Sequence, residues 1–135
     1  ILTFLTASAI FLYYQKRVRK THKEETTKLS RQINHAFDEV VELAKKNDPQ
    51  FIARFEEVYP TFWNKLNHVH PGLTPAEQHL CAMTYLNFST QQIADYSYLQ
   101  VRSVQTRRSR LRKKINLDPN VDLYQYLKAF EEENN

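Results

Sequence analysis

Residues 73–117 read LTPAEQHLCAMTYLNFSTQQIADYSYLQVRSVQTRRSRLRKKINL, and this stretch decides the fold. It opens with Thr74, Pro75 and Glu77. Threonine at the N-cap, proline at the first helical position and glutamate at the third form a capping box, which marks a helix start. Apolar residues at helical spacing then continue to about Leu86. A first helix is therefore predicted from residue 75.

Three further helices are predicted downstream of it, over about 91–96, 101–116 and 121–130. A turn of four residues separates the first two, and Asp-Pro-Asn separates the last two. The chain has one glycine in 135 residues, which disfavours a sheet built on tight hairpins. We therefore expect an all-α domain of four helices over residues 71–131.

The positive charge of the chain is concentrated in the third of these helices. Residues 101–117 hold seven basic residues and no acidic one, whereas the rest of the chain holds twelve basic and fifteen acidic residues. Like charges repel along a helix, so such a run is unusual for a surface that contacts nothing. It is typical of a surface that binds phosphates. An anionic lipid surface, or no partner at all, are the alternatives.

A helical wheel places the apolar residues of this helix on one side, at Val101, Val104, Leu111 and Ile115. The opposite side combines cations with small hydroxyl residues, which let a helix approach closely in the major groove of DNA. It consists of Arg102, Thr106, Ser109 and Lys113, flanked by Ser103 and Arg110. Gln105 lies where it could reach a base edge, and Arg112 and Lys114 point toward the phosphates.

The wheel turns Arg108 toward the interior, where an unpaired guanidinium is unfavourable. A carboxylate partner is therefore expected. We predict an ion pair between Arg108 and Glu77, at the start of the first helix.

The segment resembles the LuxR/FixJ-type helix-turn-helix domain. The resemblance rests on Leu-Thr-x-x-Glu at 73–77, Ser-x-x-x-Ile-Ala at 89–94, Arg-Ser-Val-x-Thr at 102–106 and Leu-Arg-Lys-Lys-Ile at 111–115. It implies a DNA-binding fold whose third helix enters the major groove, and a dimer contact through the helix over 121–130. Order and spacing both match over roughly the last 60 residues.

The resemblance also implies roles for individual residues. The base-reading positions of the family fall on Gln105, Thr106 and Ser109, and Arg102 is predicted to read a base as well. The phosphate-binding residues are predicted to be Thr90, Gln91, Ser103, Arg107, Arg110, Arg112, Lys113 and Lys114. Asn87 and Asn116 stand where the family often has glycine, and asparagine tolerates the same left-handed conformation.

The first fourteen residues, ILTFLTASAIFLYY, carry no charge and are followed by the basic cluster QKRVRK. Terminal tyrosines followed by basic residues are the pattern of a membrane helix that exits into the cytoplasm. Fourteen residues are too few to cross a bilayer, so we expect the apolar run to continue upstream of Ile1. An apolar helix of a soluble protein is the alternative.

A long helix is predicted over residues 15–46, which contain neither glycine nor proline. Its apolar residues are spaced alternately four and three apart, as in a coiled-coil seam. The predicted dimer seam consists of Leu29, Ile33, Ala36, Val40 and Leu43. Packing of the same stripe against its own domain is an equal alternative. Two shorter helical pieces over 47–70 follow, and their aromatic residues are expected to connect the long helix to the next domain.

The sequence offers no constellation for catalysis or metal binding. His68 and His70 have no further ligand nearby, Cys81 lies among apolar residues, and there is no glycine-rich phosphate loop. We therefore expect neither an enzyme nor a cofactor. The upstream part resembles a group of bacterial regulators in which tetratricopeptide repeats, one membrane helix and a coiled coil precede the DNA-binding domain.

The sequence thus predicts the cytoplasmic output end of a single-pass, membrane-anchored transcriptional regulator. The expected partners are double-stranded DNA, a second copy of the chain, the cell membrane and RNA polymerase. The alternative is a membrane-associated adaptor that binds partner proteins and lays its basic helix on anionic lipid.

Overall fold

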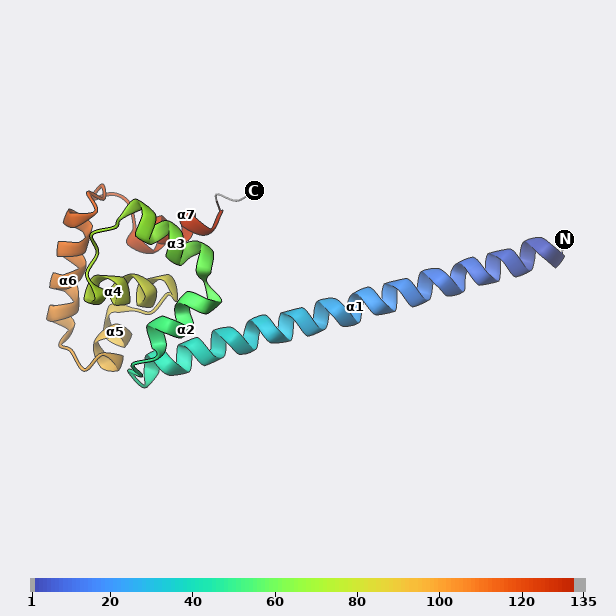
Figure 1. The fold of residues 1–135 in the computed structure, drawn as a ribbon, viewed down its shortest axis with the longest axis horizontal. Helices are drawn as coiled ribbons and strands as arrows, with labels where there is room; N and C mark the ends of the chain where they lie inside the picture. The colour runs from blue at the N-terminus through green and yellow to red at the C-terminus, as the bar shows by residue number, and fades with distance from the viewer. Residues whose placement is uncertain (1, 133–135) are drawn as a thin grey trace. The chain divides into compact units, whose positions relative to one another are not determined.

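The computed structural model describes residues 2–132, and all the regular elements in this range are helices. They are α1 (Leu2–Lys45), α2 (Phe51–Val58), α3 (Pro60–Val69), α4 (Pro75–Tyr85), α5 (Thr90–Tyr96), α6 (Val101–Lys114) and α7 (Leu123–Glu132). The predicted all-α class is confirmed for the described residues. The chain divides into two compact units, Ile1–Asp38 and Glu39–Asn135, and helices α2 to α7 belong to the second (Figure 1).

The first unit consists of the greater part of α1. The helix continues without a break from the uncharged run into the basic cluster. The prediction of a single-pass membrane protein is wrong, because none of the helices within residues 2–132 is long and apolar enough to cross a membrane.

The predicted dimer seam divides between two environments. Leu29 and Ile33 are exposed, at 59% and 68% of their surface, and Ala36 is half-buried. Val40 is fully buried and Leu43 is partly buried, and both pack in the core of the second unit. For these last two residues the prediction of a dimer contact is wrong, since their own domain already covers them.

An aromatic cluster from α2 and α3 forms one side of the core. Phe55 is fully buried, and its ring centroid lies 5.0 Å from that of Tyr59 and 5.7 Å from that of Tyr85. Phe62 stacks on Tyr85 of α4, with centroids 4.1 Å apart, and lies edge-on to Phe130 of α7 at 6.3 Å. Residues 47–70, which the sequence indicated as a connection, therefore share a core with the four helices that follow.

Helix α4 is the central helix of the second unit. Its last six residues, 80–85, are all buried, and it packs against α2, α6 and α7. A helix that is buried on every side lies in the interior of a domain. The buried Thr84 hydroxyl is satisfied within the helix, because it donates to the Leu80 carbonyl at 2.8 Å.

Asparagine ends three of the helices in the left-handed conformation. The φ angles of Asn47, Asn87 and Asn116 are 51°, 65° and 56°. At each of them the backbone N–H of the asparagine and that of the next residue donate to carbonyls of the last turn, as in a Schellman motif. Asparagine can adopt positive φ at little penalty, so these positions do not need glycine.

Helix α7 begins two residues later than the sequence predicted. The Asp122 carboxylate accepts from the Gln125 backbone N–H at 3.1 Å, which makes Asp122 the capping residue. Val121 belongs to the preceding turn, where its N–H donates to the Asp118 carbonyl at 3.0 Å. The capping box predicted for α4 is present, with Thr74 and Glu77 bonding each other reciprocally.

Candidate nucleic-acid interface

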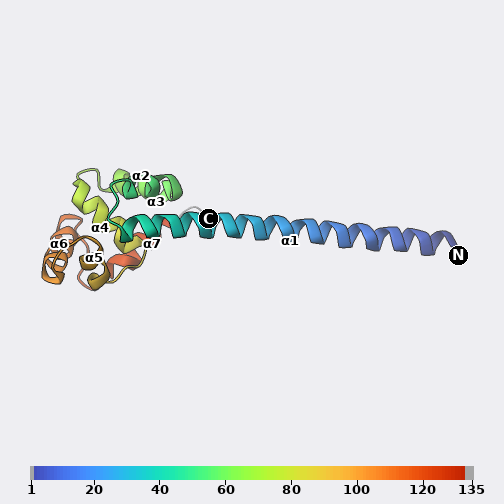
Figure 2. The ribbon, with the colours of Figure 1, turned by 90° about the horizontal axis from the view of Figure 1, so that it is seen from below.

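Helices α5 and α6 lie against each other at one side of the second unit (Figure 2). Ser89 caps α5 through a second capping box, with Gln92 at the third position. The turn between the two helices contains Tyr98, which has a φ of 54° and is 82% exposed. The Leu99 N–H closes the turn by donating to the Ala94 carbonyl at 2.9 Å. The sequence did not indicate the strained and exposed Tyr98.

Helix α6 has the two faces that the wheel predicted. Val104 and Leu111 are buried against the domain, and Val101 and Ile115 pack at the edge of the core. The outward residues are exposed; they are Arg102, Gln105, Thr106, Arg107, Ser109, Arg110 and Lys113, with Ser103 half-buried beside them. The Thr106 hydroxyl donates to the Arg102 carbonyl at 3.0 Å, so its oxygen keeps its outward lone pairs.

The predicted ion pair between Arg108 and Glu77 is wrong. Arg108 is half-buried and donates from Nη1 to the Thr90 hydroxyl oxygen at 2.7 Å. Burial lowers the pKa of Arg108, and the nearby Asp122 carboxylate partly offsets this effect. The guanidinium points toward the start of α5 and not toward the start of α4, because successive inward positions of α6 face different helices.

Glu77 instead pairs with the last residue of α6. Lys114 Nζ lies 2.8 Å from Glu77 Oε2, and the same oxygen accepts the Thr74 backbone N–H at 2.8 Å. The hydrogen bond from Lys114 is the main reason that the pKa of Glu77 is lowered. Lys114 was predicted to contact phosphate, but it has a partner within the domain.

Arg112 also has internal partners. Its Nη2 donates to the carbonyl oxygens of Asp118 at 2.9 Å and Val121 at 2.7 Å. The guanidinium thereby holds the turn between α6 and α7. Its predicted role as a phosphate contact does not match this geometry, because three backbone carbonyls, Pro119 included, already surround the donor.

The other cations of α6 stay available to a partner. Within the described residues, Arg102, Arg107, Arg110 and Lys113 have no carboxylate within 4 Å. Three of them border a shallow pocket of about 350 Å³ on the outward face, which Gln100, Ser103 and Thr106 complete. Four unpaired charges on one face, with no acidic residue in the helix, attract an anion.

The two predicted phosphate contacts at the start of α5 form hydrogen bonds within the domain. The Thr90 hydroxyl accepts from Arg108, and Thr90 is half-buried. Gln91 is exposed, but its side-chain amide donates to Asp95 Oδ1 at 2.8 Å. Thr90 thus binds a residue of α6, whereas Gln91 binds a residue of its own helix.

The side chains on the exposed face of α6 are suited to binding a partner. Among residues 2–132 there is no group of three histidine, cysteine or carboxylate side chains that could hold a metal ion. Burial raises the pKa of the Cys81 thiol to about 12, and the negative charge of Glu77 adds to this effect. What the surface provides is an exposed helix face with unpaired cations, hydroxyl groups and an amide. Comparison with protein-family models, curated proteins and solved structures gave no match to this chain.

Proposed function

We propose that the chain is a sequence-specific DNA-binding transcriptional regulator. Helices α4 to α7 would form a LuxR-type helix-turn-helix domain, with α5 and α6 as the two helices of the motif. Helix α6 would lie in the major groove, with Gln105, Thr106 and Ser109 toward the bases. The observation that carries the proposal is the exposed face of α6, where Arg102, Arg107, Arg110 and Lys113 lack counterions.

The different environments of the cations of α6 support this proposal, because three bind groups of the domain and four, within the described residues, do not. Arg108, Arg112 and Lys114 are bound to groups of the domain itself. A solvated surface helix would gain from acidic neighbours at the remaining positions, but α6 has none. The outward positions between the cations are small, which allows the backbone to approach the base pairs. Gln105 is suited to a bidentate contact with adenine.

We further propose that the regulator binds DNA as a homodimer. Leu29 and Ile33 are exposed four residues apart on α1, as expected for an unpaired helix seam. Two copies would read two half-sites about one helical turn apart. The seam is shorter than the sequence indicated, because Val40 and Leu43 pack within their own domain.

The test is the salt dependence of binding between the full chain and a pool of fluorescent duplexes. The logarithm of the binding constant should fall linearly with the logarithm of salt concentration, with a slope of about −0.9 per neutralised phosphate. The variant Arg102→Gln/Arg110→Gln should bind at least about tenfold more weakly at the same salt, with a slope smaller by about two. The matched control Lys28→Gln/Arg31→Gln removes the same charge from α1 and should bind as the wild type does.

Two results would overturn the proposal. One is the absence of binding by the wild type at low salt. The other is an equal loss of affinity in both double variants, which would show that net charge and not the face of α6 is responsible. If binding is present, selection from random duplexes should enrich paired half-sites about 10 base pairs apart.

A further inference from the structure

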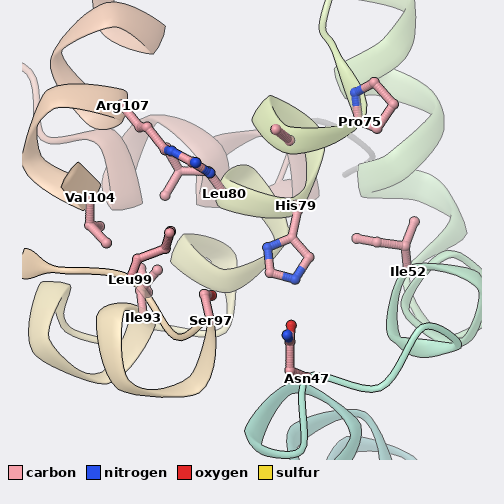
Figure 3. Close-up of a pocket in the computed structure, with 11 residues that line it drawn as sticks. Asn47, Ile52, Pro75, His79, Leu80, Ile93, Ser97, Leu99, Val104 and Arg107 are labelled. Atoms are coloured by element: carbon pink, nitrogen blue, oxygen red, sulfur yellow. The ribbon is translucent and has the colours of Figure 1, made fainter.

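A second concave site borders the proposed DNA-binding face of α6, at the junction of α4, α5 and α6. It is a pocket of about 420 Å³, and residues at the end of α1 and in α2 complete its rim (Figure 3). All of its lining residues belong to the second unit. Pockets of this size hold small organic molecules.

The floor of the pocket is apolar. Five aliphatic side chains from four helices and the turn after α5 line it: Ile52, Leu80, Ile93, Leu99 and Val104. Ile93 and Val104 are almost completely buried, so they form the base, whereas Ile52 and Leu99 are partly exposed at the sides. Removing this surface from water would favour an apolar ligand.

The polar groups of the pocket converge on the same space (Figure 3). Arg107 enters from α6, His79 from α4, Ser97 from the end of α5 and Asn47 from the end of α1. The Ser97 hydroxyl oxygen is buried and has no hydrogen-bond partner in the structure. A buried hydroxyl without a partner is unfavourable, so a ligand oxygen that accepts from the Ser97 hydroxyl would be stabilised.

The charged residues that line the pocket determine which sign of charge a ligand should carry. Its lining residues include Arg107 and no carboxylate. His79 is held edge-on to Phe51, with ring centroids 5.3 Å apart, and burial together with the charge of Arg107 lowers its pKa. A neutral imidazole can donate one N–H. The pocket thus offers one cation and several hydrogen-bond donors, which is unfavourable for a cationic ligand and favourable for an anionic one.

We infer that this pocket is a binding site for a small organic anion that joins an aromatic or short aliphatic body to a carboxylate or sulfonate group. The body lies on Ile93, Leu99 and Val104. The anionic group meets Arg107 and accepts from the Ser97 hydroxyl. The site is separate from the proposed DNA-binding face, although Arg107 borders both, and its test therefore contains no DNA.

The test is a fluorescence titration of the full chain with 8-anilinonaphthalene-1-sulfonate. The wild type should show saturable binding of one molecule per chain. Arg107→Gln should weaken the affinity about tenfold, the usual effect of losing one charge-assisted hydrogen bond. Arg110→Gln removes the same charge from the same helix outside this pocket and should change the affinity less than about twofold.

A second variant and a pair of competitors make the test specific. Ala76 is exposed at the rim, so Ala76→Trp should fill the pocket, abolish probe binding and leave the helical circular dichroism unchanged. Octanoate should displace the probe, and octylamine, which has the same chain with a cationic end, should not. The inference is overturned by non-saturable fluorescence in the wild type, by equal effects of Arg107→Gln and Arg110→Gln, by full probe binding in folded Ala76→Trp, or by equal displacement with octylamine.

Discussion

The Arg108 guanidinium donates from Nη1 to the Thr90 hydroxyl oxygen at 2.7 Å and so joins the middle of α6 to the first residue of α5. Arg108 is half-buried, and its Nε atom is buried without a partner. The Thr90 hydroxyl is thus a principal hydrogen-bond acceptor for the half-buried Arg108 guanidinium. This bond is one of the contacts between the two helices that carry the proposed DNA-binding face.

Thr90→Val keeps the shape of the side chain and removes the acceptor. We expect the free energy of unfolding to fall by about 1 kcal/mol, because the half-buried Arg108 donor loses its acceptor. In an Arg108→Met background the same change should have almost no effect, since no donor remains. Urea unfolding of the wild type, both single variants and the double variant measures the coupling; strictly additive losses would contradict it.

Glu77 performs two functions that substitution can separate. Glu77→Gln keeps an acceptor for the Thr74 N–H and loses the charge that faces Lys114, so we expect a loss below about 1 kcal/mol that shrinks in high salt. Glu77→Ala also removes the capping interaction and should lose about 1 kcal/mol more, at any salt concentration. Thermal unfolding at low and high salt compares the two variants; equal losses would mean that the cap contributes nothing.

Phe55 tests whether α2 and α3 belong to the folded core. Phe55→Ala should lower the free energy of unfolding by about 3–5 kcal/mol, because the ring is fully buried among aromatic neighbours. Phe37→Ala is the matched control on α1, where the ring is 42% exposed, and it should change stability by less than about 0.5 kcal/mol. Similar stabilities of the two variants in urea would show that α2 is not part of the cooperative unit.

The half-buried His79 makes the domain sensitive to acid. Burial first, and the charge of Arg107 second, lower its pKa from the usual value of 6.5, and burial lowers the pKa of His70 as well. The unfolded chain therefore binds more protons than the folded chain as the pH falls below about 6.5, and the free energy of unfolding decreases over that range. His79→Gln should flatten this dependence in unfolding experiments between about pH 7.5 and about pH 5.5. An unchanged slope would exclude His79 as a contributor.

Cys81 should be inert in the folded protein. Its side chain is 1% exposed, and burial raises its thiol pKa to about 12, so almost no thiolate exists at neutral pH. An aromatic disulfide reagent should therefore react only through unfolding, with a rate that rises in urea in step with the loss of helical signal. Fast stoichiometric reaction in buffer would show that α4 opens more readily than its burial indicates.

Local features of the sequence were sufficient to predict the last four helices, with ends that lie within about two residues of those in the structure. Thr74 with Glu77 predicted the start of α4, and Asn87 and Asn116 end α4 and α6 in the left-handed conformation. The alternation of apolar and basic residues in α6 predicted which face is buried. These features depend on interactions within one helix turn, so neighbouring residues contain the information.

The tertiary structure alone decided which cations remain free. Glu77 and Lys114 are 37 residues apart, and Arg112 meets carbonyls that only the course of the next turn brings near. It also decided that Val40 and Leu43 pack in their own domain, and that five separate segments enclose one pocket. The periodicity of apolar residues predicts which side of a helix faces the core. It does not predict which residue a given side chain contacts there, because contacts between distant segments depend on how all the helices pack together.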